Sequence, residues 1–504
     1  MCVKIGIRRL IIVVISFLLQ ISLSLFLYLH LSDHMQAVKV VYTIISMIII
    51  LAMLRNSKNI SYDLPWIIII MVFPIIGGLL YLTIGINLRR NKTFKKIVKR
   101  QIKDTKYLVQ DEKIKKEIED NGYDQLRYIT DYLNFPVSKN NEYKYYSIGN
   151  MDLLNDMLAD LESAENFIFL EYFIINEGLM WNSILDVLKK KASSGVEVRV
   201  MYDDMGSITT LPYNYDKKLE SFGIKCVAFN PVKPFLGIFM NNRNHRKMMN
   251  IDGRVMYTGG VNIADEYINK IKRFGEWKDN AIRISGDSIW NYTVSFLTLW
   301  NSHREEDSNY LKYKYDFKKK LKTNGYCSLY VDTPLDDEIT GENVYLNIIN
   351  QAKKYLYIYT PYLIIDDVMQ NALILASKRG VDIRLVLPAI PDKKVVYTVT
   401  TSYFAPLAEY GVKIYKYTPG FVHSKVFLAD DEVATVGTIN MDYRSLYMHF
   451  ESGVYIKDGD IIPEIKKDFE DAFLKSHKLS RKEANPGLIK AVWQSILRLF
   501  ASLL

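Results

Sequence analysis

Two short segments of the sequence each place a histidine and a lysine two residues apart, HRKMMNID at residues 245–252 and HSKVFLAD at residues 423–430. Residues i and i+2 of a strand point to the same face, so each imidazole would lie beside an ammonium group. A single segment of this kind is more typical of a half-buried strand with a polar face. Its recurrence in one chain favours a catalytic role over a purely structural one. An imidazole can attack phosphorus or carry a proton, and an ammonium group can hold phosphate oxygens.

The repeated pattern extends beyond the histidine and the lysine. Each segment ends in an aspartate, and after six further residues comes Gly-x-x-Asn, at 259–262 and at 437–440. A pattern of five fixed positions over 18 residues therefore occurs twice. The predicted catalytic residues are His245, Lys247, Asp252, His423, Lys425 and Asp430.

A hairpin between each aspartate and the following glycines would complete the local geometry. Both aspartates open a two-residue turn signal between apolar runs, at 252–253 and at 430–431. Such a turn puts Gly260 opposite His245 and Thr438 opposite His423. The two aspartates then lie at the far end of the hairpin from the histidines, where turn and local hydrogen bonding is the expected role.

Other segments also recur, such as GVEVRV at 195–200 and GVDIRL at 380–385, so the chain holds two copies of one unit. Apolar β-rich runs at 167–175 and 355–365 alternate with amphipathic helical stretches. We therefore predict an α/β fold with two duplicated domains at 126–310 and 311–484, each a mixed sheet flanked by helices, related by pseudo-twofold symmetry. The charged, tyrosine-rich residues 301–323 are predicted to connect the copies.

The N-terminal part of the chain is strongly apolar. Runs at 10–29, 40–54 and 64–86 predict two to three transmembrane helices, since about 20 apolar residues cross a bilayer, and hence a membrane anchor over residues 1–88. A basic juxtamembrane segment follows at 89–125. Its residues 89–106 carry nine Lys or Arg against one Asp, which predicts a multi-pass protein of the cell membrane with cytoplasmic catalytic domains. Three complete spans would place the N-terminus outside despite its own basic residues, so one run could instead be re-entrant or interfacial.

The net charge of +9 and the C-terminal segment NPGLIKAVWQSILRLFASLL also suit contact with anionic membrane lipids. Residues 485–504 predict an amphipathic helix at the membrane interface, although a core helix fits the pattern equally well. Three cysteines, Cys2, Cys226 and Cys327, show neither a disulfide framework nor metal-ligand spacing.

Two histidines and two lysines, one pair from each copy, predict a single site between the domains. One imidazole would form a covalent phosphoryl-histidine, and the other would protonate the leaving alcohol and then deprotonate the incoming one. Lysine and asparagine donors would hold the non-bridging oxygens. A metal site is the competing explanation for clustered histidines. The neighbouring lysines and the lack of a carboxylate-rich cluster disfavour it, so no metal or cofactor is expected.

The motifs HRKMMNIDGRVMYTGGVN and HSKVFLADDEVATVGTIN resemble those of the phospholipase D superfamily. The segments NNRNHRK, TGGVNIADEY, EWKD, TPGFVHSK and GTINMDYRSLYMHFE, together with the apolar N-terminal runs, resemble bacterial cardiolipin synthases within that superfamily. The resemblance implies two phospholipase D-like domains and a metal-independent phosphatidyl transfer. Two phosphatidylglycerol molecules would give cardiolipin and glycerol.

The resemblance also implies roles for single residues. His245 would be the nucleophile and His423 the general acid and base. The acidic residue after each asparagine would orient its histidine, which assigns Glu451 to His423 and leaves Asp279, at a longer spacing, for His245. The residues expected to bind phosphate or support the site are Asn262, Asn440, Gly260, Thr438, Asp279 and Glu451, with Lys247 and Lys425 also on the phosphate.

Rival functions share parts of this evidence. A hydrolytic phospholipase D or another phosphatidyltransferase would use the same site and differ in the molecule that resolves the intermediate. A nuclease would suit the positive charge, but the apolar runs disfavour nucleic acid as a partner. A non-catalytic membrane scaffold would not need two intact motifs.

Overall fold

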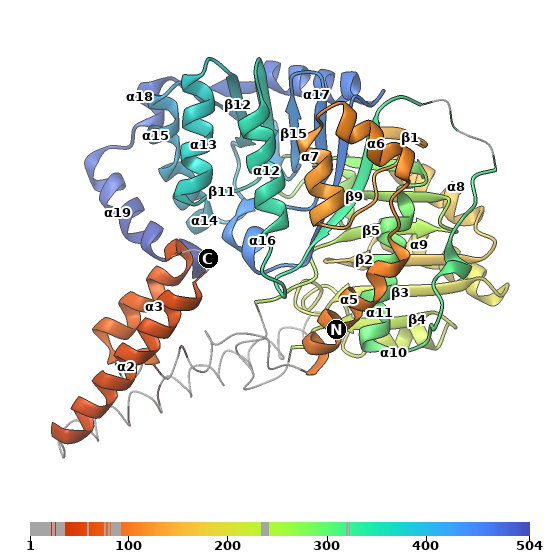
Figure 1. The fold of residues 1–504 in the computed structure, drawn as a ribbon, viewed down its shortest axis with the longest axis horizontal. Coiled ribbons are helices and arrows are strands. Elements are labelled where there is room, and N and C mark those ends of the chain that lie inside the picture. The colour runs from red at the N-terminus through yellow and green to blue at the C-terminus, as the bar shows by residue number, and fades with distance from the viewer. Residues whose placement is uncertain are drawn as a thin grey trace.

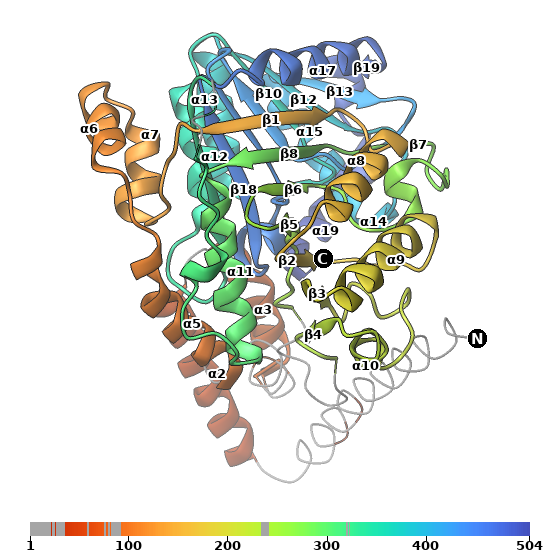
Figure 2. The ribbon, with the colours of Figure 1, turned by 90° about the vertical axis from the view of Figure 1, so that its right-hand side faces the viewer.

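Two mixed sheets form the body of the protein (Figures 1 and 2). The structure is a computed structural model that describes residues 22, 26, 36–57, 60–74, 77–78, 81, 92–232, 241–318, 321 and 323–503. The first sheet has seven strands in the order β1-β8-β6-β5-β2-β3-β4, which Figure 2 shows one below the other. The second sheet has eight, in the order β9-β18-β16-β15-β10-β12-β13-β19.

The two sheets have the same connectivity. The strands of the first are β1 (Asn141–Tyr146), β2 (Phe167–Tyr172), β3 (Glu197–Asp203), β4 (Lys225–Phe229), β5 (Lys247–Ile251), β6 (Val255–Gly259) and β8 (Ala281–Gly286). Those of the second are β9 (Tyr326–Asp332), β10 (Tyr355–Tyr359), β12 (Asp382–Pro388), β13 (Lys413–Tyr417), β15 (Val426–Ala429), β16 (Val433–Gly437), β18 (Glu451–Lys457) and the additional β19 (Ser476–Lys478). Three strands in each sheet run parallel, β2-β3-β4 and β10-β12-β13, and the other neighbours are antiparallel. The predicted duplicated α/β fold with mixed sheets is confirmed.

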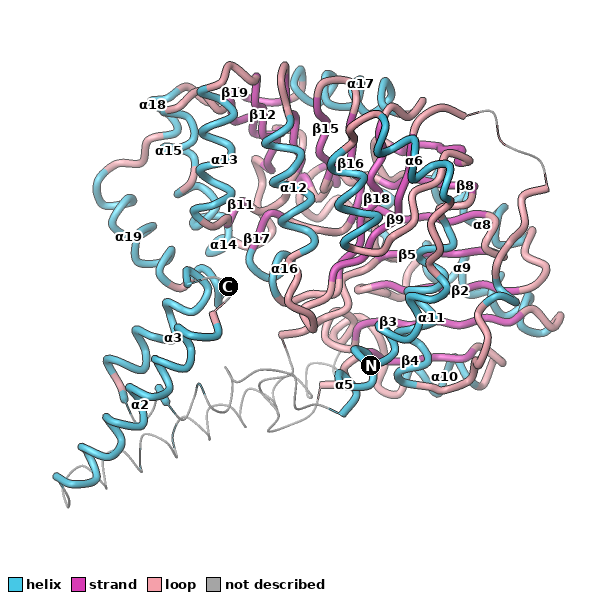
Figure 3. Tube along the Cα trace, viewed as in Figure 1, coloured by secondary structure: helices cyan, strands magenta, loops and turns pink. Residues whose placement is uncertain are grey.

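Helices cover both sheets and also fill the space between them (Figure 3). The outer layer of the first sheet holds α8 (Met151–Glu162), α9 (Leu179–Ser193) and α10 (Tyr215–Glu220), and that of the second holds α12 (Thr340–Gln351), α13 (Asp367–Lys378), α14 (Lys394–Ser402) and α15 (Phe404–Glu409). Between the sheets lie α11 (Ile289–His303) and α17 (Ile462–Leu474). Phe167 and Phe169 of β2 join this central core, while Ile168 and Leu170 join the outer one. Because both faces are buried, central strands such as β2 and β10 are almost continuously apolar.

Shorter elements complete the body. They are α6 (Glu112–Asp120), α7 (Asp124–Arg127), β7 (Glu276–Lys278), β11 (Leu363–Ile364), β14 (Gly420–Val422), β17 (Met441–Asp442), α16 (Tyr443–Tyr447) and α18 (Arg481–Ala484). Strand β14 pairs with β7, which joins the second copy to the first.

Both motif hairpins form, but the predicted register is wrong by one residue in each. Asp252 and Gly253 have positive φ values of 55° and 65°, and Arg254 N donates to Ile251 O as a two-residue turn requires. The ladder nevertheless pairs Ile251 with Val255, and Ala429 with Val433 in the second copy. One unpaired residue after each turn, as in a β-bulge, therefore moves the cross-strand pairing by one position from the predicted register.

The motif aspartates bind backbone amides at the far end of the hairpins from the histidines. The Asp252 carboxylate accepts hydrogen bonds from the N–H groups of residues 165, 166 and 167, each at 2.8 Å. The Asp430 carboxylate accepts three from residues 353, 354 and 355, at 2.7 to 2.8 Å. Each aspartate thus ties its hairpin to the start of β2 or β10.

The basic segment after the apolar runs packs against the body. Helix α5 (Lys92–Asp104) contacts α11 and buries Phe94 and Ile97 in the central core. The buried Asp104 carboxylate accepts hydrogen bonds from the hydroxyls of Thr298, at 2.9 Å, and Tyr310, at 2.8 Å. Helix α5, which follows the apolar region, is therefore held against α11 between the sheets.

The apolar ends of the chain lie next to each other. Helices α2 (Gln36–Asn56) and α3 (Ile60–Val72) pack together and extend away from the body (Figure 1). Helix α3 contacts residues 501–503, which follow α19 (Leu488–Leu499). The predicted span at 10–29 lies outside the described residues apart from Ser22 and Phe26, as do parts of the run at 64–86. Within the described ranges, no helix combines the length and apolar character needed to cross a membrane.

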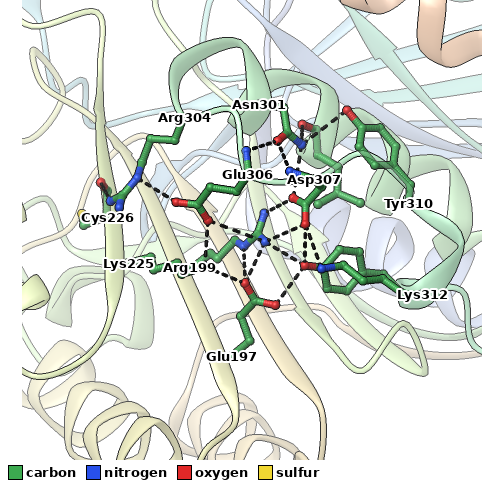
Figure 4. A network of polar contacts seen from close by, with 12 residues as sticks. Glu197, Arg199, Lys225, Cys226, Asn301, Arg304, Glu306, Asp307, Tyr310 and Lys312 are labelled. Atoms are coloured by element: carbon green, nitrogen blue, oxygen red, sulfur yellow. Dashed lines mark hydrogen bonds and ion pairs between the residues drawn. The ribbon is translucent and has the colours of Figure 1, made fainter.

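The predicted connection at 301–323 begins as part of the first domain. Helix α11 continues to His303, and the residues after it pack on β3 through a charged network (Figure 4). Arg199 binds Asp307 at 2.6 Å and Glu197 at 2.7 Å, and Lys225 binds Glu306 at 2.8 Å. Arg199 and Asp307 are buried, so this pair holds the outgoing chain against the sheet.

We expect replacement of Asp430 by Asn to destabilise the fold, because an amide nitrogen would face one of the three bound N–H groups. A hydrogen bond to a charged group contributes about 1.5–3 kcal/mol, so the free energy of unfolding should fall by about 2 kcal/mol or more. Denaturant unfolding of the detergent-solubilised chain measures this. Asp431→Asn, at an exposed ion pair with Lys466, is the matched control and should cost about 1 kcal/mol or less. Equal losses in both variants would contradict the role assigned to Asp430.

Candidate active site

Each histidine is held by backbone of the other copy. His245 precedes β5, and its N–H donates to Phe450 O at 2.9 Å. His423 follows β14, and its N–H donates to Lys278 O at 2.7 Å. These two carbonyls come one residue before Glu451 and Asp279, so the two interdomain contacts involve corresponding positions of the two copies. They bring the acid of one copy to the histidine of the other.

The histidine–carboxylate pairs are therefore crossed. His245 Nδ1 lies 2.9 Å from Glu451 Oε1, and His423 Nδ1 lies 2.6 Å from Asp279 Oδ2. The assignment of Glu451 to His423, and with it of Asp279 to His245, is wrong. Sequence proximity suggested pairs within one copy, whereas β14 pairing with β7 and the bridge between Asn244 and Phe450 exchange the partners. With Nδ1 engaged by a carboxylate, Nε2 of each ring is the nitrogen left for a substrate.

Gly260 and Thr438 both act on the carboxylates. Thr438 Oγ1 donates to Glu451 Oε2 at 2.5 Å and accepts from Ser452 N at 2.9 Å. At Gly260 a Cβ atom would lie 2.0 Å from Asp279 Oδ1, so any side chain there would displace the acid. The two copies thus support their acids differently, one by a hydroxyl group and the other by close backbone approach.

The two motif lysines are buried in the same site. Lys247 Nζ donates to His245 O at 2.5 Å, and Lys425 Nζ donates to His423 O. Burial lowers the pKa of Lys247 to about 7, and the charge of Lys425 contributes to this shift. Burial likewise lowers the pKa of Lys425 to about 8. Since charges from both copies act on each other, the four motif side chains belong to one composite site.

The two asparagines differ in their surroundings. Asn262 Oδ1 accepts from Ile174 N at 3.0 Å, and its Nδ2 donates to Tyr267 OH at 2.8 Å. Asn440 is buried, and its Oδ1 has no hydrogen-bond partner among the described residues. Phosphate binding by either asparagine stays a prediction.

Comparison with known proteins agrees with the duplicated fold and the paired motifs. The family described as "Cardiolipin synthase, PLD-like domain" matches residues 157–284 and 345–473, and the family described as "Phospholipase_D-nuclease N-terminal" matches residues 40–85. The chain belongs to the cardiolipin synthase family of phospholipase D-like enzymes. The two matched regions include both histidine–lysine motifs and both crossed acids.

Relatives in this family are similar over most of their length. A cardiolipin synthase of Staphylococcus aureus strain N315 is 34% identical over 446 residues, covering 86% of this chain and 88% of that protein. Cardiolipin synthase 1 of Staphylococcus aureus strain COL is 33% identical over 490 residues, covering 93% and 97%. A phosphatidylserine synthase from Haemophilus influenzae shares the fold, with a TM-score of 0.55 at 14% identity over 75% of this chain and 98% of that structure.

A third histidine at the site was missed by the sequence interpretation. His449 is buried, its ring centroid lies 5.5 Å from that of His245, and its Nδ1 lies 3.6 Å from Glu451 Oε1. Its position two residues before Glu451 could have indicated its place in the site. Trp277, two residues before Asp279, occupies the corresponding position in the first copy. Neither ring nitrogen of His449 has a hydrogen-bond partner within the part of the chain that the structure describes.

Burial sets the protonation of the paired histidines. It lowers the pKa of His245 well below the ordinary value, although Glu451 opposes the shift. Burial and the charge of Lys425 lower the pKa of His423 to about 4 against the opposing effect of Asp279. Burial alone would raise the pKa values of Glu451 and Asp279, but the facing imidazoles hold both below their ordinary values. At neutral pH the lipid-free site therefore holds ionised acids and neutral imidazoles.

Because its pKa is depressed to about 4, His423 should stay neutral as the pH falls from 8 to 5. An ordinary imidazole gains a proton near pH 6.5. Histidine ¹⁵N NMR of the lipid-free protein measures this, with the His423→Asn variant as the means of assigning the resonance. A His423 midpoint near 6.5 would show that burial does not control the site.

Proposed function

We propose that this chain joins two phosphatidylglycerol molecules into cardiolipin and releases glycerol. The observation that carries the proposal is the pair of crossed histidine–acid contacts, each with a lysine beside the histidine, in a chain of the cardiolipin synthase family. Such a site has two imidazoles for proton and phosphorus chemistry and two cations for the phosphate.

The reaction would proceed in two displacements at phosphorus. His423 takes up a proton on Nε2 when the anionic phosphate binds beside it. His245 Nε2 then attacks the phosphorus of the first phosphatidylglycerol, and the bond to the glycerol headgroup breaks as His423 gives that oxygen its Nε2 proton. His423 then accepts the proton of a glycerol hydroxyl of the second phosphatidylglycerol. This oxygen attacks the phosphorus and releases His245, which leaves cardiolipin and glycerol as the only products.

The remaining site residues would support these steps indirectly. Lys247 and Lys425, with Asn262 and Asn440, would hold the non-bridging oxygens where charge develops. The crossed acids would fix the imidazole tautomers, since a carboxylate at Nδ1 keeps the proton there and leaves the Nε2 lone pair free. Asp252 and Asp430 would serve as positioning residues, because they hold the hairpins and do not face the imidazoles.

Membrane attachment fits the exposed surface at both ends of the chain. On α19, Leu488 and Ile489 are 82% and 88% exposed, and Trp493 is exposed beside them. The α2–α3 pair also exposes a large apolar surface, formed by Val40, Val41, Ile44, Ile45, Met47, Ile48, Leu51, Leu54, Ile60, Met71 and Val72. Surfaces of this size on neighbouring segments favour lipid contact, with α19 lying in the interface. The nine Lys or Arg against one Asp at 89–106 support a cytoplasmic position for the catalytic domains. A multi-pass anchor is part of this proposal.

Incubation of the purified protein with labelled phosphatidylglycerol alone tests the reaction. Labelled cardiolipin and an equimolar amount of glycerol are expected. Phosphatidic acid as the main product would mean that water resolves the intermediate and would contradict the transfer in favour of a hydrolytic phospholipase D.

The two histidines should respond differently to replacement. Both His245→Ala and His423→Ala should lose turnover, because each serves a separate step. With labelled phosphatidylglycerol, only His423→Ala should slowly acquire a covalent phosphatidyl label, since it keeps the nucleophile. Acid-quenched protein analysed by mass spectrometry reports the adduct. A labelled His245→Ala protein would reverse the two roles.

The crossed pairs predict that the two acids control different limbs of the pH dependence of kcat, which reports the lipid-bound site where the phosphate charge favours a protonated His423. Each acid raises the pKa of its facing histidine, so its neutral replacement lowers that pKa. Glu451→Gln should move the acid limb, where His245 must lose its proton, to lower pH. Asp279→Asn should move the alkaline limb, where His423 must keep its proton, to lower pH. Each shift should be about one pH unit or more, with some movement of the other limb because the pair is coupled. If Glu451→Gln moved mainly the alkaline limb, His423 would be its functional partner after all.

Chelators should not lower the transfer rate. The groups assigned to the phosphate are lysines and asparagines, so no step requires a divalent ion. The rate of cardiolipin formation before and after dialysis against EDTA measures this. Loss of activity that a single divalent ion restores would contradict the assignment.

A further inference from the structure

The third histidine gives one half of the site a ligand set that the other half lacks. His449 is 9% exposed and its side chain is directed at the His245–Glu451 pair. The corresponding residue beside His423 and Asp279 is Trp277, which offers no lone pair. Among the described residues no hydrogen bond satisfies this buried imidazole, and its nearest acid, Glu451 Oε1, lies 3.6 Å from Nδ1. A ligand bound between the two would satisfy a buried polar group that is costly to leave unbonded.

The distances suit a small tetrahedral ion. One ligand atom from each of His245, His449 and Glu451 lies within 4.8 Å of the other two. Glu451 Oε1 is 2.9 Å from His245 Nδ1 and 3.6 Å from His449 Nδ1. Ligand bonds of about 2.0–2.1 Å in a tetrahedron place neighbouring ligand atoms about 3.3 Å apart, which lies between these two separations. Two histidines and one glutamate also form a known zinc ligand set.

The surrounding charges limit which ions can bind. Arg243 and Arg246 lie nearby, but Arg243 is paired with Asp203 at 3.3 Å and Arg246 lies 3.8 Å from Glu171. Lys247 remains as a basic group close to the histidines, since its Nζ donates to His245 O. A hard ion that prefers oxygen ligands, such as Mg²⁺, gains little from two imidazoles and is repelled by this lysine. A zinc-like ion gains two strong nitrogen ligands.

We propose that His245, His449 and Glu451 bind a zinc-like divalent ion and that the bound ion inhibits phosphatidyl transfer. The inhibition rests on the proposed role of His245 as nucleophile. An ion on Nδ1 takes the place of the proton that His245 shares with Glu451. The neutral ring keeps one proton, which then resides on Nε2, so the lone pair needed to attack phosphorus is lost. His423 retains its own acid and is not part of the ion site.

Binding is tested directly with Co²⁺, whose visible absorption reports tetrahedral nitrogen and oxygen ligation without any need for activity. The full-length protein in detergent should bind one Co²⁺ that Zn²⁺ displaces and that Mg²⁺ in excess does not. His449→Phe keeps a ring of similar size, and His449→Asn keeps a polar side chain in case the first variant folds poorly. Either variant should weaken binding by at least tenfold, since even indirect partners of metal ligands change affinity about 10- to 100-fold. His477→Asn, at an exposed histidine–glutamate pair, is the matched control and should bind like the parent chain.

Inhibition is tested separately, with each variant compared with its own metal-free rate. Zn²⁺ should stop cardiolipin formation by the parent chain, EDTA should restore it, and the His449 variants should need at least about ten times more Zn²⁺. No Co²⁺ signal, or a signal that the His449 variants retain, would overturn the site. Binding that requires His449 but leaves the rate unchanged would overturn the inhibitory role. Failure of the metal-free parent chain to form cardiolipin would instead contradict the proposed function and leave the binding result standing.

Discussion

The site depends on one arrangement of charge, two buried imidazoles that each face a carboxylate supplied by the other half of the chain. A buried ionised acid is tolerated only where hydrogen bonds and opposite charge compensate its lost hydration. Here the compensation comes from across the interface, through the histidines and the two motif lysines. Association of the halves and protonation of the site are therefore linked. The central core with α11 and α17 supplies the apolar contact that keeps these charges away from water.

The two copies share a backbone but differ in the groups around the imidazoles. Thr438 binds Glu451 through a hydroxyl group, whereas Gly260 lets Asp279 approach the backbone. His449 lies beside one imidazole and Trp277 beside the other. A reaction in which one histidine attacks and the other transfers protons requires such a difference, because two rings in identical surroundings would share both protonation states equally. Duplication within one chain permits it, since each copy changes independently.

Much of this was predictable from the sequence because the signals are local. The repeated spacing of His245 and His423 with their lysines gave the motifs, and the recurring strand and helix patterns gave two mixed sheets. The hairpin register was wrong because the residue added after each turn, Arg254 in the first copy, has no distinct sequence signal. The crossed partners of Glu451 and Asp279 were not predictable, since they follow from the contact between domains. His449 was passed over because one histidine outside a repeated pattern carries little information until its neighbours in space are known.

The exchange of partners also limits how such a site can arise. A protein with a single copy would hold a histidine whose acid faces away from it, and the acid would find no imidazole within its own chain. Two such chains could complete both pairs only by meeting face to face through an isologous contact, with one rotation axis between the histidines. The contact between the halves would then have existed as soon as the site was active, and the peptide connection between them would have been added later. In that view β14 beside β7, and Asn244 beside Phe450, are a subunit contact preserved inside one chain.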